Sequence, residues 1–457
     1  MESLVREAIA GSRADFVEVR WDEIAWSRVA FQRDQLMALE QSKEVGGIVR
    51  ALVGGAWGVA LLTDMAEIPT QVEEATRLAR MASQHVKEPT ELAEVPVEEE
   101  RHVAELKEDF RSVPLSRKRT QAEEYNKLIM GYSPEIVSTG VRYTDTFRKS
   151  LYANSEGTFI YQELPDVTLL LAAVARRNGD IQQAFEPIGE AAGYELVCGR
   201  QEKAEAAAKR AVDLLSAKPV KGGTYTVLLD QQLAGVFIHE AFGHGCEADF
   251  LFRNPHMREV MKLGRRFGAE VLNVVDDGYI PGARGNSPFD DEGVRRQKVY
   301  LIREGVLSGL MHSRATAHKM GMEPTGNARA ISWEHEPIVR MRNTYIEPGE
   351  ATFEEMIKDV DNGIYAKAAF GGQTMFEQFT FSAGYAYEIK GGEVGPMLRD
   401  VVLTGNVFHI LKNIDMVGRD FQLLGGSGGC GKGGQGPLPV TDGAPHVRVH
   451  EVTIGGR

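Results

Sequence analysis

Hydrophobic and polar positions in the first 90 residues follow a strand-like pattern and then a helical one. Residues Phe16–Trp21 alternate as a half-buried strand does, and Gly46-Gly47 and Gly54-Gly55 separate further apolar segments as turns would. From Thr70 to Val86, apolar side chains recur at helical spacing on one stripe. We therefore expect strands within residues 16–63, followed by a helix.

A second block has the same order. The helix that ends this block is alanine-rich and amphipathic and covers Gln201–Ala217, and a turn lies at Asn154–Gly157. The strand patterns before the helix are Gly140–Tyr143, Arg148–Tyr152, Thr158–Gln162 and Thr168–Val174. The intervening residues 87–112 are acidic, contain prolines and have few apolar positions, which is typical of a solvated connection with some helix. The similar order leaves an internal repeat open.

A third region begins after a boundary at Pro219–Gly223. Tyr225–Leu229 is a compact strand pattern, and Asp230 is a suitable N-cap for a helix that follows it. The remaining chain is rich in strand and turn signals, with one clear short helix at Ala351–Ile357. We predict an α+β protein with an N-terminal α+β domain and its acidic helical connection, a middle α+β domain and a β-rich C-terminal domain, at residues 1–115, 116–220 and 221–457.

Composition narrows the class of protein. The 457 residues carry a formal net charge of −13, which argues against binding to nucleic-acid phosphates or to an anionic membrane surface. The N-terminus lacks the basic start and apolar run of a signal peptide, and apolar runs are too short to cross a bilayer. The 3 cysteines are too few for a disulfide framework. We expect a cytoplasmic protein that binds neither nucleic acid nor membrane.

The segment His239-Glu240-Ala241-Phe242-Gly243-His244 holds the strongest candidate chemistry. Two imidazoles and a carboxylate are what a hydrolytic zinc site needs. The histidines stand at i and i+5, however, which places them roughly 140° apart on a regular α-helix. A widened turn with i+5 hydrogen bonds would return both rings to one face. Alternatively, His244-Gly245 is an ordinary helix end.

A catalytic zinc ion usually has three protein ligands, so a third donor is needed. Glu247 and Asp249 are suited to orient the histidines from behind as hydrogen-bond acceptors. Cys430 lies in the glycine-rich segment Gly425–Gly436, whose backbone can approach another surface closely, and Lys432 nearby would favour its thiolate. The candidates are Cys246, Glu247, Asp249, His256 and Cys430.

The same segment partly matches a phosphate-binding loop, through Gly426, Gly431 and Lys432. The next position is Gly433 instead of the Ser or Thr that would bind magnesium, and Pro437 follows where a helix should run. We do not expect nucleotide binding.

With these motifs in place, the C-terminal half resembles the TldD/PmbA family of zinc metallopeptidases, on its catalytic TldD side. The resemblance covers about residues 225–450 in the family's order, and the N-terminal half is similar more loosely. It rests on His239–Gly245, Phe289–Gly293, Thr325–Arg329 with Pro337, Arg342–Gly349, Gly371–Gln373 and Gly429–Lys432.

The resemblance implies Zn²⁺ bound by His239, His244 and Cys430, with Glu240 as the general base. The expected activity is hydrolysis of peptide bonds in unfolded or modified peptides by metal-activated water. Family members form two-subunit assemblies, so we expect a homodimer or a heterodimer with a PmbA/TldE-like subunit. The alternative is a zinc-containing peptide-binding or maturation subunit without cleavage activity of its own. Candidates for stabilising an oxyanion are His409, Tyr345 and Arg342.

Overall fold

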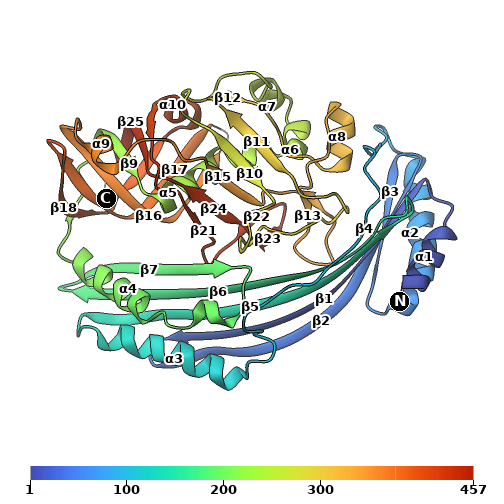
Figure 1. Ribbon diagram of the computed structural model, residues 1–457, viewed down its shortest axis with the longest axis horizontal. Helices are drawn as coiled ribbons and strands as arrows, with labels where there is room; N and C mark the ends of the chain where they lie inside the picture. The colour runs from blue at the N-terminus through green and yellow to red at the C-terminus, as the bar shows by residue number, and fades with distance from the viewer. Residues whose placement is uncertain (1, 376, 456–457) are drawn as a thin grey trace.

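A computed structural model describes residues 2–375 and 377–455 and shows two layers (Figure 1). The N-terminal half forms a long, curved sheet, and the C-terminal half lies above it. The observed mixture of sheets and helices confirms the predicted α+β class. No helix in the described ranges is both long and apolar enough to cross a membrane.

The N-terminal sheet has the strand order β3-β2-β1-β5-β6-β4, and β7 pairs with β6 beyond β4, on the edge away from β5. Its neighbours are antiparallel apart from the pair β4 and β6. Because β1 pairs with β5, the first two predicted domains contribute to one shared sheet. The strands are β1 (Phe16–Gln32), β2 (Gln35–Val53), β3 (Ala56–Leu62), β4 (Glu99–His102), β5 (Ile136–Asn154), β6 (Phe159–Arg177) and β7 (Asp180–Glu190).

Four helices described in this half cover parts of the sheet. The predicted helices are confirmed as α2 (Ile68–Ser83), which packs on β2 and β3, and α4 (Gln201–Leu214), which packs on β6 and β7. The alanine face of α4 is fully buried, as its periodicity predicts. Sequence patterns did not indicate α1 (Glu2–Ala10) or α3 (Leu115–Gly131), which packs on β5 and α4.

The two glycine pairs of this half have different roles. Gly54-Gly55 makes the turn between β2 and β3, and both residues have positive φ. The prediction of a turn at Gly46-Gly47 is wrong, because both residues lie inside β2 opposite Asp22 and Trp21. A Cβ on Gly46 would lie 2.5 Å from the Trp333 ring. Glycine is needed there because the C-terminal half packs directly onto the strand.

The C-terminal half contains a closed ring of strands, in the order β16-β9-β25-β19-β17, with β17 pairing back to β16. The predicted strand at 225–229 is β9, and the predicted short helix is α9 (Phe353–Ile357). Strands of this sheet are β8 (Lys218–Pro219), β9 (Gly223–Leu229), β16 (Asn362–Met375), β17 (Gln378–Lys390), β18 (Glu393–Arg399), β19 (Val402–Asn406), β20 (Ile414–Val417) and β25 (Val447–Gly455).

A second sheet lies beside the ring, with the order β12-β11-β10-β15-β24-β21. The helix α5 (Gln231–Ile238) packs between the two, against β16 on one side and β24 and β15 on the other. Strands of this sheet are β10 (Val274–Asp277), β11 (Lys298–Arg303), β12 (Val306–Leu307), β15 (Asn343–Ile346), β21 (Gln422–Leu424) and β24 (Thr441–Ala444).

Shorter elements surround these sheets. Two of them are hairpins whose strands have two to four residues, and the others are short helices. They are β13 (Ala328–Arg329) with β14 (Ile338–Val339), β22 (Cys430–Lys432) with β23 (Gln435–Leu438), α6 (Ala248–Arg253), α7 (Pro255–Val260), α8 (Arg314–Met320) and α10 (Val407–Lys412).

Buried charges attach the C-terminal half to the sheet. Asp291 lies 2.7 Å from Arg148 on β5, and the same guanidinium lies 2.9 Å from Asp22 on β1. Glu292 contacts Arg50 on β2 at 3.3 Å. All of these side chains are buried or nearly so. Asp291 and Glu292 of the Phe289–Gly293 motif therefore join the two layers.

Candidate metal centre

The helix that carries the two histidines begins as the sequence predicts. The Asp230 carboxylate caps α5 by accepting a hydrogen bond from the Leu233 N–H at 2.9 Å. At His239 the helix widens, and the His244 N–H donates to the His239 carbonyl five residues earlier. This confirms the predicted i+5 turn. Gly243 is required inside it, because a Cβ there would lie 2.2 Å from the Met341 sulfur.

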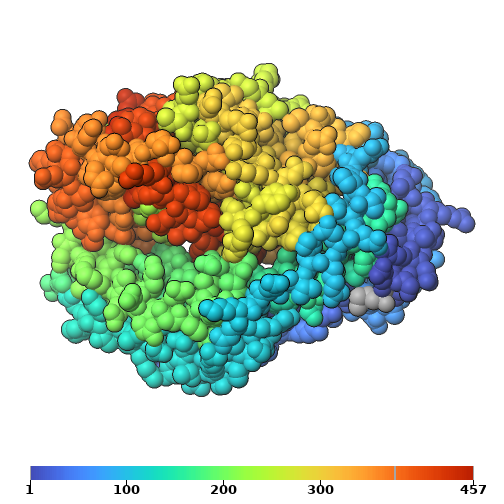
Figure 2. All heavy atoms as spheres, in the orientation of Figure 1, coloured from blue at the N-terminus to red at the C-terminus, as the bar shows by residue number. Residues whose placement is uncertain are grey.

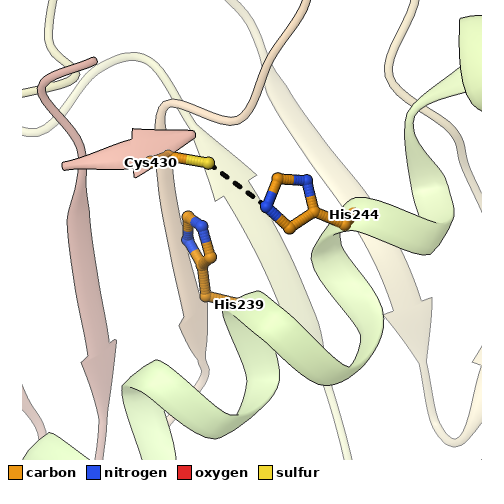
Figure 3. Close-up of side chains that lie close together, drawn as sticks. All are labelled: His239, His244 and Cys430. Atoms are coloured by element: carbon orange, nitrogen blue, oxygen red, sulfur yellow. Dashed lines mark hydrogen bonds between the residues drawn. The ribbon is translucent and has the colours of Figure 1, made fainter. Parts of the chain in front are cut away.

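The widened turn brings both imidazoles to one place, where Cys430 meets them (Figure 3). The ring centroids of His239 and His244 are 5.3 Å apart, with their planes at 89°. The Cys430 Sγ lies 3.2 Å from the His244 Nε2. One donor atom from each of the three residues lies within 4.8 Å of the others. Donors of a tetrahedral zinc ion with these ligands are about 3.5 Å apart, so the group fits a metal of that size.

A carboxylate lies behind each imidazole. His239 Nδ1 is 2.8 Å from Asp442 Oδ1, and His244 Nδ1 is 2.9 Å from Glu247 Oε2. The contact of His244 is a hydrogen bond, whereas that of His239 is a short charge contact without hydrogen-bond geometry. Because Nδ1 faces a carboxylate in both rings, Nε2 is the donor left for a metal. The prediction that Glu247 orients a histidine is confirmed.

Two arginines hold the segment that carries Cys430. Arg340, which is fully buried, donates to the Cys430 carbonyl at 2.6 Å and to the Gln435 carbonyl at 3.0 Å. Arg329 donates to the Pro439 carbonyl at 2.8 Å, at the far end of the hairpin β22–β23. The thiol is therefore positioned by a rigid framework even though its own segment is mostly glycine.

The three groups shift one another's protonation. Burial alone would raise the pKa of Cys430, but hydrogen bonds with His239 and His244 lower it to about 5. Burial would lower the pKa of His244, but Cys430 and Glu247 raise it to about 9. For His239, contact with Asp442 and Cys430 outweighs burial and raises the pKa well above its usual value. The centre thus favours a thiolate with positive charge beside it.

Glu240 lies between two cavities. The larger, of about 600 Å³, is lined by His239, Cys430 and residues of β7 and α4. The smaller, of about 330 Å³, is lined by His244. Of the residues that the structure describes, Glu240 is the one that lines both. Burial raises the pKa of its half-buried carboxyl group. Figure 2 shows the red C-terminal segment reaching the surface at the seam with the green residues of β7 and α4.

Other sequence candidates lie elsewhere. Cys246 is fully buried in the hydrophobic core, and His256 is on the surface. The prediction that Asp249 orients a histidine is wrong, because its carboxylate accepts a hydrogen bond from Lys432 Nζ at 2.6 Å. Lys432 also contacts Glu247 at 3.1 Å. Lys432 is thus paired with two carboxylates, and the side chains that lower the pKa of Cys430 most are His239 and His244.

The three candidates for an oxyanion stabiliser are not among the described residues that line either cavity. Arg342 is fully buried and donates to the Gly326 and Ser287 carbonyls. Tyr345 donates to Asp277 on β10, and His409 is on the exposed face of α10. Arg342 and Tyr345 thus stabilise the framework, and His409 lies at the surface.

Sequence reasoning missed Asp442, Arg340 and Lys367. Lys367 lines the larger cavity and donates from Nζ to the Tyr365 hydroxyl at 2.6 Å, and burial lowers the pKa of this lysine. Each residue lies in a strand or at a strand end that is far from the histidine motif in the sequence. Only the folding of the chain brings these residues to the centre. The sequence contained one weak signal for such a residue, because Asp442 is an acid in a mostly apolar stretch after the glycine-rich segment.

Comparisons with known proteins show which family this chain is similar to. Residues 222–456 match the PmbA/TldA metallopeptidase C-terminal domain, and residues 108–215 match the central domain. A metalloprotease of Synechocystis sp. is 40% identical over 97% of this chain and 96% of its own. A zinc metalloprotease TldD homolog of Saccharolobus solfataricus is 32% identical over 71% of this chain and 72% of its own. TldE from Thermococcus kodakarensis has the same fold, with a TM-score of 0.78, 19% identity and complete coverage of both chains.

The two family models and the relatives named as metalloproteases place this chain in the metallopeptidase class. The chain belongs to the TldD/PmbA metallopeptidase family.

Proposed function

We propose that this protein is a zinc-dependent peptidase in which His239, His244 and Cys430 bind the metal and Glu240 is the general base. The observation that carries the proposal is the meeting of three donor atoms within 4.8 Å beside a carboxylate that lines two cavities. Two imidazoles and a thiolate are a donor set that suits zinc better than magnesium or calcium. The name of the Saccharolobus relative, a zinc metalloprotease, supports that choice.

Zinc, when bound, supplies a Lewis acid that polarises the scissile carbonyl and makes water a better nucleophile. Glu240 takes the proton from the attacking water and returns it to the leaving amine nitrogen. Asp442 and Glu247 keep the imidazoles in the tautomer with a metal-directed Nε2.

The substrate in this proposal is an extended peptide that occupies both cavities, with its scissile bond at Glu240. Glu240 lies between cavities of about 600 and 330 Å³, and an extended chain can place one of its bonds there more readily than a folded domain can. Unfolded or modified peptides fit this requirement. We further propose that the protein works as a homodimer or with a TldE-like partner, since TldE shares the fold.

Mass spectrometry of an unstructured peptide after incubation with the zinc-loaded protein tests the proposal. We expect internal fragments that disappear when a chelator removes zinc and return when zinc is restored. Binding of the intact peptide without fragments would contradict hydrolysis and favour the alternative, a zinc-containing subunit that binds peptides for maturation.

A further inference from the structure

The smaller cavity beside Glu240 differs from the larger one in the polarity of its walls. Its walls are mainly apolar, whereas the larger cavity contains several charged side chains, including Lys203, Arg210 and Lys367. The apolar walls of the smaller cavity are Ala241, Phe242, Phe250, Met257, Met261 and Phe408.

This apolar space is not an ordinary part of the hydrophobic core. Phe242, Met257 and Met261 belong to the core, but Phe250 is 41% exposed, and a volume of about 330 Å³ stays open between these side chains. Such a volume holds on the order of ten waters, which find few hydrogen-bond partners along apolar walls. An apolar group that replaces these waters gains free energy.

The polar side chains at the cavity's edge discourage an acidic occupant. Lys432 lies at this edge, and its Nζ is already within 3.1 Å of Glu247 and 2.6 Å of Asp249. Glu240 and Glu247 contribute negative charge on the side that faces the metal ligands. An aromatic or long aliphatic side chain suits the apolar walls, whereas an acidic one would lose its hydration shell there and lie near two carboxylates.

We propose that the smaller cavity binds the side chain of one residue that flanks the scissile bond, and that it selects large apolar residues, above all Phe, Leu and Met. This inference rests on the proposed peptidase function, because it is the shared Glu240 that places the cavity next to the bond being cut.

The first test measures binding without turnover. The zinc-loaded Glu240→Gln variant is titrated with fluorescent glycine- and serine-rich peptides that carry one central Phe, Lys or Asp. We expect the Phe peptide to bind about 10- to 100-fold more tightly than the Asp peptide. Equal affinities for Phe and Asp would overturn the inference.

The second test changes the cavity wall. Phe250→Glu places a carboxylate at a position that is exposed enough to tolerate it, and we expect the ratio of Lys-peptide to Phe-peptide affinity to rise at least about tenfold. Leu263→Glu is the matched control, since Leu263 is 45% exposed and lies outside the walls of both cavities as described. The same shift in both variants would assign the change to general charge and overturn the inference.

Fragment analysis of the three peptides with the wild-type protein separates this inference from the proposed function. Cuts next to the Phe residue, on one fixed side, support both. Cuts at positions unrelated to the Phe residue would overturn the inference of a specificity pocket but would still support the peptidase function. A binding preference for Phe without any cut overturns the peptidase function, together with the position of the pocket at a scissile bond.

Discussion

Glu247 Oε2 lies 2.9 Å from the Nδ1 of His244 and 3.1 Å from the Nζ of Lys432. Glu247 is 1% exposed, and contacts with His244 and Lys432 keep its pKa below the usual value despite burial, which would raise it. A fixed carboxylate at this position orients the ring and strengthens Nε2 as a donor.

Replacement of Glu247 by Gln should therefore weaken zinc binding by about 10- to 100-fold, as is usual for such partners of metal ligands. Competition with a chelating dye measures the affinity. Asp249→Asn is the control, because Asp249 contacts the same lysine but neither histidine. Unchanged zinc affinity in the Glu247 variant would contradict the role of this contact.

Replacement of Cys430 by Ser should remove stoichiometric zinc, because a hydroxyl group is a much poorer ligand than a thiolate beside two imidazoles. Elemental analysis of the purified protein gives the zinc content. Cys198→Ser should retain zinc, since Cys198 donates to the Tyr194 carbonyl, a bond that a serine hydroxyl can make. Full zinc in the Cys430 variant would refute the ligand assignment.

Asp291→Ala should destabilise the protein by about 3–5 kcal/mol, because it leaves the buried Arg148 and Arg20 guanidinium groups without this partner. The pKa of Asp291 is lowered to about 2, since these arginines outweigh the effect of burial. Urea unfolding measures the free energy of unfolding. Glu74→Ala, in an exposed pair with Arg77, should have little effect. Equal effects of both substitutions would count against the interlayer anchor.

His312 should make stability depend on pH. Burial lowers the pKa of this 1% exposed side chain from 6.5 to about 4. The folded protein therefore binds the proton less readily than the unfolded chain, so stability present above pH 6.5 is lost as the pH falls towards 4. The loss is about 3 kcal/mol at about 1.4 kcal/mol per pKa unit.

Unfolding curves of the wild-type protein and His312→Asn between pH 7 and 4 measure this contribution. The variant should lose less stability on acidification, whereas His256→Asn, at an exposed position, should follow the wild type. Parallel pH profiles for the wild type and the His312 variant would contradict this explanation.

Sequence periodicity predicted the elements whose surroundings are simple. The helices α2 and α4 each bury one stripe against a sheet, so their patterns were visible. The helix α3 was missed, because it buries Lys118 and Asn126 as well as apolar residues. The length of β5 was missed for a similar reason. Its concave face contacts the C-terminal half through charged residues such as Arg148, which hides the alternation.

The candidate centre was predictable in part. The spacing of His239 and His244 indicated the widened turn, and resemblance supplied Cys430. The contributions of Asp442 and Arg340 could not be read from the chain, because strand pairing far from the motif brings them to the centre. The apolar cavity likewise depends on side chains from α6, α7 and α10 that meet only in the fold.

The most direct measurement compares zinc content and peptide cleavage in the wild type and in Glu240→Gln. Gln keeps the size of the side chain but cannot accept the proton, and it does not remove a ligand. We expect full zinc in both proteins, with cleavage reduced at least about 100-fold in the variant. Cleavage at the wild-type rate by the zinc-loaded variant would contradict it.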